Sequence, residues 1–161
     1  MSRLFPAVLL AGALVAGPPG APQAFSVDSG AQAALRALWT ASVAARAERV
    51  ACLASVIDGD TLHITRVQPL TTGADSLAVS ALTSLEQCGP PEWQGTVHTH
   101  IPLREGQSAS PLFSGSDRGV MLMWGQRWRT AGTFCLLYSS EKVHCEIDGP
   151  EGGLIFPSAS Y

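Results

Sequence analysis

The chain has 161 residues, of which 46% are apolar and only 14% are charged. This length fits one domain with a short additional segment, and the apolar content excludes an intrinsically disordered chain. The net charge of −3 and the scattered basic residues exclude a nucleic-acid-binding surface and a polybasic membrane patch.

Residues 1–24 have the order of a secretory signal peptide. Arg3 precedes an apolar run over 4–16, and the segment 17–22 then breaks any helix. The run is too short for a stable membrane span, which needs about 20 residues. We therefore predict export, periplasmic or secreted, with cleavage near Ala24, although Pro22 stands where a small residue is preferred. The alternative is a disordered or anchoring tail, which would leave the protein in the cytoplasm.

In the first half of the remaining chain, the residue patterns predict a helix, a β-hairpin and a second helix. Apolar residues at helical spacing predict a helix over 31–47. Two β-branched or alternating segments, 50–57 and 61–67, flank the turn Asp58-Gly59-Asp60 and predict a β-hairpin. Apolar residues on one helical face predict a second helix over 74–87, ended by Gly89-Pro90-Pro91.

The second half predicts a strand, a helix and a closing hairpin. The strand covers 93–100, and a loop over 101–113 leads into a helix from about 116 to 128. Two further strands, 133–138 and 142–147, form the hairpin. This order of elements predicts an α/β or mixed α+β domain, with a mixed sheet flanked by helices.

The domain is expected to cover residues 25–148, and the Gly/Pro/Ser-rich segment 149–161 is expected to be a flexible tail.

The four cysteines do not have Cys-x-x-Cys spacing, which argues against a cysteine-rich zinc knuckle. An even number in an exported protein permits two disulfides. Cys135 and Cys145 flank a predicted turn, so a bridge between their strands is one possibility. The alternative is that Cys52, Cys88, Cys135 and Cys145 are small buried apolar residues.

Two histidines, His98 and His100, lie one residue apart near the end of a predicted strand. Side chains alternate along a strand, so both point to the same face, about 6.6 Å apart. Two such imidazoles can bind one metal ion, and Asp117, where a loop enters a helix, is the best third ligand. Each part alone is a weak signal, because Ser114-x-x-Asp117 is also an ordinary helix start and Glu48 could be a solvated residue.

Together these residues resemble the JAB/MPN family of zinc metalloproteases, also called JAMM. That family carries an upstream Glu, then His-x-His, then Ser-x-x-Asp, which correspond here to Glu48, to His98-Thr99-His100 and to Ser114-Gly115-Ser116-Asp117. The resemblance covers about 32–147. It implies the JAB/MPN architecture, which is cytidine-deaminase-like.

The resemblance also implies the chemistry of the site. His98, His100 and Asp117 would bind Zn²⁺, Glu48 would act as general base on a metal-activated water, and Ser114 would hydrogen-bond the oxyanion. The implied activity is that of a zinc peptidase or isopeptidase. Its substrate would be a peptide or a protein, such as a ubiquitin-like tail.

The chain departs from the family pattern between His100 and Ser114, where thirteen residues form a longer linker than usual. Ser108 has the usual spacing, but Pro111 then occupies the place of the acid, so 101–113 is interpreted as a lengthened loop. Two alternatives therefore stay open. One is a catalytically inactive MPN-like binding or scaffold module, and the other is an exported, disulfide-stabilised domain whose histidines are incidental.

Overall fold

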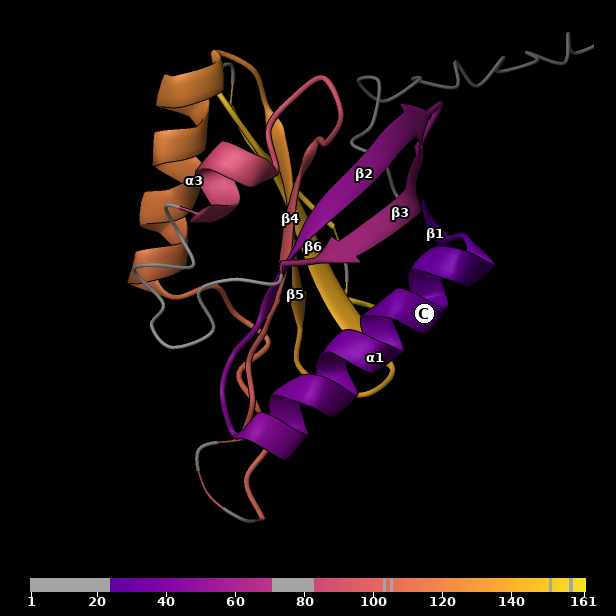
Figure 1. The fold of residues 1–161 in the computed structure, drawn as a ribbon. Coiled ribbons are helices and arrows are strands. Elements are labelled where there is room, and N and C mark those ends of the chain that lie inside the picture. Colours follow the sequence, from indigo (N-terminus) through magenta and orange to yellow (C-terminus); the bar gives the residue numbers. More distant parts are fainter. Residues whose placement is uncertain (1–23, 71–82, 103, 105, 151, 157) are drawn as a thin grey trace, which may run out of the picture.

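The computed structural model describes residues 24–70, 83–102, 104, 106–150, 152–156 and 158–161. In this part of the chain, helices α1 (Ser29–Ala45) and α3 (Gly115–Trp128) lie on opposite sides of one sheet (Figure 1). A short helix over 83–87 lies on the same side as α3. The described residues therefore form three layers, with the sheet in the middle.

The strands are β1 (Ala24–Val27), β2 (Val50–Asp58), β3 (Thr61–Pro69), β4 (Gly95–Thr99), β5 (Gly132–Leu137), β6 (Lys142–Asp148), β7 (Leu154–Ile155) and β8 (Ala159–Ser160). Their order is β1-β3-β2-β4-β5-β6-β7, and β8 also pairs with β6. The pairs β1–β3 and β4–β5 are parallel, whereas the other pairs are antiparallel. This arrangement confirms the predicted mixed sheet flanked by helices.

The central part of the sheet is buried on both faces, because helices cover each side. In β2, Ala51 and Leu53 belong to the core beneath α1, whereas Cys52 and Ala54 belong to the core beneath α3 and the helix over 83–87. The sequence of β2 is accordingly apolar at consecutive positions rather than at alternate ones.

The two long helices cover these faces with different residues. Leu35 and Leu38, at the helical spacing that predicted α1, are 0% and 3% exposed. On α3, Met121 and Trp124 are 2% and 0% exposed. Burial of each such side chain stabilises the fold by about 1.5–3 kcal/mol.

Helix α1 ends at Ala45, two residues before its predicted end. Arg46 adopts a left-handed conformation with φ of 50°, and its N–H donates to the carbonyl groups of Ser42 and Val43. This turn ends α1 and leads into β2, and Glu48 lies two residues before that strand begins.

The cysteines form two disulfides, Cys52–Cys88 and Cys135–Cys145. The first joins β2 to the residue that follows the helix over 83–87, and the second joins directly paired positions of β5 and β6. All four residues are at most 3% exposed. The cross-strand bridge was one of the possibilities that the sequence left open.

The end of the chain differs from the flexible tail expected over 149–161. Strands β7 and β8 pair with β6, and the side chains of Phe156 and Tyr161 are 1% and 7% exposed. Both aromatic side chains join the core beneath α1, which explains why this Gly/Pro/Ser-rich segment is held against the sheet.

Strand β1 was not predicted either, because it begins at the predicted cleavage site. Residues 1–23 of the predicted leader and residues 74–82 of the predicted second helix lie outside the described residues. In the part that the structure describes, no helix has both the length and the apolar character needed to cross a membrane.

Candidate metal centre

Three predicted ligands come together where β4 meets α3. His98 lies on β4, His100 follows the last residue of that strand, and Asp117 lies in the first turn of α3. The two Nε2 atoms of the histidines are 3.3 Å apart. Oδ1 of Asp117 is 3.3 Å from Nε2 of His98, and Oδ2 is 3.4 Å from Nε2 of His100.

One ligand atom from each of the three residues lies within 4.8 Å of the other two, which is close enough for the group to bind one metal ion. Ligand atoms at about 2.0–2.1 Å from a tetrahedral zinc lie about 3.3 Å from one another. Two imidazoles and one carboxylate leave the fourth position for water or substrate, as in catalytic zinc sites. The side chains of His98, His100 and Asp117 are each only 12% exposed, so little solvent competes with an ion there.

The loop over 101–113 orients His100. Nδ1 of His100 lies 3.2 Å from the carbonyl oxygen of Ser110. A carbonyl oxygen can only accept a hydrogen bond, so Nδ1 carries a proton and Nε2 is the nitrogen left for a metal ion.

Asp117 is held by the start of its own helix. The N–H of Ser114 donates to Oδ2 of Asp117 at 2.6 Å, and the N–H of Asp117 donates to Oγ of Ser114 at 3.2 Å. This capping box confirms the helix-start interpretation of Ser114 and fixes the carboxylate beside the histidines.

The electrostatics of the cluster favour a positive charge between its members. Burial acts to raise the pKa of Asp117, but hydrogen bonds from His100 and His98 outweigh it and hold that pKa far below its usual range. The hydrogen bond to Asp117 raises the pKa of His100 against the effect of burial, and the negative charge of Glu48 raises it further. A metal cation would satisfy the same preference as a proton.

Glu48 lies at the His100 end of the cluster. Val50 is the register partner of His98, and the N–H of Thr99 donates to the carbonyl of Arg49 at 3.0 Å. The half-buried Glu48 precedes this paired segment, and its negative charge acts on the imidazole of His100. The structure thus brings the predicted general base into the neighbourhood of the predicted ligands.

Ser114 is exposed and lies at the N-cap of α3. Its Oγ accepts a hydrogen bond from the N–H of Asp117, which leaves its hydroxyl proton for another acceptor. The lengthened loop ends beside it at Phe113, whose ring lies 5.6 Å from the ring of His98. The additional loop residues therefore return to the site.

Thr99, between the two histidines, was not singled out by the sequence. Its side chain is fully buried, and its Oγ1 lies 2.6 Å from Oγ of Ser42 on α1. It also accepts a hydrogen bond from the N–H of Arg49 at 2.9 Å. Strand alternation could have placed Thr99 on the α1 side, but nothing in the sequence indicated its partner.

A second polar cluster anchors the start of α3 to β6. Arg118, which follows Asp117, forms two hydrogen bonds with the carboxylate of Glu146, and Nε2 of His144 lies 3.0 Å from Oε1 of the same group. Glu146 is 5% exposed. This cluster also escaped prediction, because its residues meet only when β6 and α3 pack together.

No family model matches this chain, and no curated protein matches it. The resemblance to the JAB/MPN family therefore rests on the motif residues and on their arrangement.

Proposed function

We propose that this protein is a zinc-dependent peptidase or isopeptidase of the JAB/MPN type. The observation that carries the proposal is the convergence of one ligand atom each from His98, His100 and Asp117, which lie within 4.8 Å of one another. Glu48 lies near His100, and Ser114 lies at the N-terminus of α3, beside Asp117. These two positions support a catalytic role for the ion rather than a purely structural one.

In the proposed mechanism His98, His100 and Asp117 hold the ion. A bound zinc lowers the pKa of a coordinated water to about 7 and polarises a substrate carbonyl. Glu48 accepts a proton from the attacking water and returns it to the leaving amine. Ser114 donates a hydrogen bond through its hydroxyl group to the oxyanion that develops on the carbonyl.

The site itself is tested by metal content. We expect about one zinc per chain in the wild-type protein and a clear loss in His100→Ala, measured by elemental analysis after dialysis against dilute zinc. His63→Ala is the matched control, because His63 lies on β3, where its Nδ1 contacts Ser26. Unchanged zinc in His100→Ala would remove His100 from the ligand set.

The role of Glu48 is tested separately from metal binding. We expect Glu48→Gln to keep its zinc and to cleave a complex peptide mixture, read by mass spectrometry, about 10²–10⁴-fold more slowly. Wild-type rates in this variant would contradict a general base at residue 48. Zinc bound without turnover in the wild-type protein would favour the inactive binding or scaffold module.

Export remains part of the proposal. Two disulfides among the described residues favour an oxidising compartment, as the leader-like segment over 1–24 does. Mass determination of the native N-terminus tests this, since a mature chain that begins near Phe25 supports export and an intact Met1 contradicts it.

A further inference from the structure

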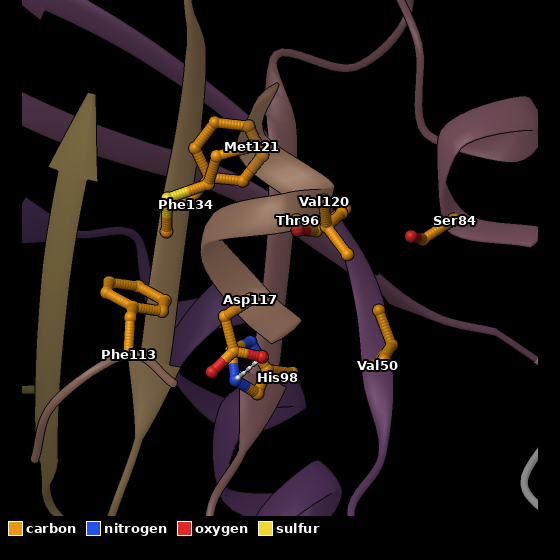
Figure 2. A pocket seen from close by; sticks show the side chains of 9 residues that line it. All are labelled: Val50, Ser84, Thr96, His98, Phe113, Asp117, Val120, Met121 and Phe134. Carbon is orange, nitrogen blue, oxygen red and sulfur yellow. Dashed lines mark ion pairs between the residues drawn. The ribbon is translucent and has the colours of Figure 1, made fainter. Parts of the chain in front are cut away.

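A small cavity opens directly beside the candidate metal centre. It lies between the sheet, α3 and the helix over 83–87, and two of the proposed ligands, His98 and Asp117, form part of its wall (Figure 2). His100 is not among its lining residues. The cavity therefore extends from the His98 side of the ion, whereas Glu48 lies towards the His100 side.

The rest of the wall is mainly apolar. Val50 and Val120 border the cavity from β2 and α3, and their side chains are drawn beside Asp117 and His98 in Figure 2. Met121 and Phe134, each 2% exposed, close its inner end. None of these four side chains carries a charge, so the cavity favours an aliphatic group over a charged one.

The size of the cavity limits what it can hold. Its volume is about 40 Å³. An apolar cavity of about 150 Å³ is known to bind benzene, so this much smaller cavity favours a small aliphatic group over an aromatic ring. An isopropyl group fits that space, a methyl group leaves part of it empty, and a phenyl ring exceeds it.

We propose that this cavity is a specificity pocket, which binds a valine-sized aliphatic side chain of the substrate next to the bond that is cleaved. The inference rests on the proposed zinc site, because two of the proposed ligands, His98 and Asp117, line the pocket. The substrate class is thereby narrowed to peptides or protein tails with a small aliphatic residue at the cleavage site.

The pocket is tested by binding, independently of turnover. Acetohydroxamate, isobutyrohydroxamate and benzohydroxamate share one metal-binding group and carry a methyl, an isopropyl and a phenyl group. Their dissociation constants are measured from the visible spectrum of the cobalt-loaded protein. We expect isobutyrohydroxamate to bind about tenfold more tightly than acetohydroxamate, from the additional apolar burial, and benzohydroxamate to bind more weakly than isobutyrohydroxamate.

Two variants at one position change the size of the pocket. Val120→Phe should abolish the preference for isopropyl over methyl, because the larger side chain fills the pocket that distinguishes the two groups. Val120→Ala should enlarge the space and improve the binding of benzohydroxamate. Leu122→Phe is the control, since Leu122 lies on the same helix but is 61% exposed and does not line the cavity.

The outcomes separate the two proposals. Failure to bind cobalt, or binding of no hydroxamate, overturns the metal site and the pocket with it. Equal affinities, or tightest binding of benzohydroxamate by the wild-type protein, overturn the pocket and leave the metal site intact. Unaltered visible spectra of the ligand-free cobalt-loaded Val120 variants show that they fold, so that a loss of preference is attributable to the pocket.

Discussion

Glu146 connects the residue after Asp117 to the sheet. Its buried carboxylate receives hydrogen bonds from Arg118 on α3 and lies beside His144 on its own strand. Burial alone would raise the pKa of Glu146, but the hydrogen bonds from Arg118 and His144 outweigh it, and the pKa lies below its usual value of 4.5. The ionised form is therefore stabilised by folding.

We predict that Glu146→Gln lowers the free energy of unfolding by about 1–3 kcal/mol at pH 7. Because the folded pKa of Glu146 is depressed, its contribution is complete above the unfolded pKa and is lost as the pH falls through the folded pKa. Urea unfolding at several pH values should show the difference between variant and wild type shrinking below about pH 4.5.

Glu86→Gln serves as the control for this experiment, because Glu86 is an exposed residue of the helix over 83–87. A difference between Glu146→Gln and wild type that stays the same from pH 7 to pH 3 would contradict the assigned role of the carboxylate.

At the scale of elements, each disulfide fixes a different contact. Cys52–Cys88 closes a sequence separation of 36 residues and ties the helix over 83–87 to β2, beside the pocket. Cys135–Cys145 closes a separation of only 10 residues between strands that are already paired. In the chain-entropy account, the longer loop gains more from its bridge.

We predict that replacing both Cys52 and Cys88 with Ala lowers the free energy of unfolding by about 2–4 kcal/mol. The corresponding double variant of Cys135 and Cys145 should lose about 1 kcal/mol less. All four side chains are almost fully buried, so the two variants are matched in the apolar contacts that they remove. Urea unfolding measures both, and a larger loss in the Cys135/Cys145 variant would contradict the comparison.

At the scale of the whole molecule, an ion bound by His98, His100 and Asp117 would join the sheet to α3. Binding to the folded state alone stabilises that state, whereas the unfolded chain offers the three groups far apart. The metal is thus expected to act on the stability of the entire domain.

We predict that zinc at about 100 times its dissociation constant raises the free energy of unfolding by about 2.7 kcal/mol, with a matching rise in the melting temperature. Asp117→Asn keeps the size of the side chain but removes its charge, and it should show no such rise. Scanning calorimetry with and without zinc measures both proteins. An equal rise in wild type and variant would place the bound zinc elsewhere.

The central elements could be predicted because their patterns are local. The apolar spacing of Leu35 and Leu38 marks α1, and Ser114 and Asp117 mark the start of α3 through a capping box that needs only four consecutive residues. The pairing of His98 and His100 on one face likewise follows from the geometry of a single strand.

What could not be predicted depends on contacts between distant segments. Strand β1 pairs with β3 and β8 with β6, but both are too short to show a clear pattern. Phe156 and Tyr161 are isolated aromatic residues in a polar segment, so only the finished core shows that they are buried. The Cys52–Cys88 pairing and the cluster around Glu146 also depend on contacts between residues far apart in the sequence, so they could not be predicted either.

The alternation of side chains around Thr99 strongly specifies the register of β4. His98 and His100 face α3, whereas the hydroxyl of Thr99 is bonded to Ser42 on the α1 side. A slip of one residue would send both imidazoles into the apolar layer beneath α1 and would leave the Ser42 hydroxyl without Thr99. The same error would thus separate the two histidines from Asp117 and bury unpaired polar groups, so the observed register is strongly favoured over its neighbours.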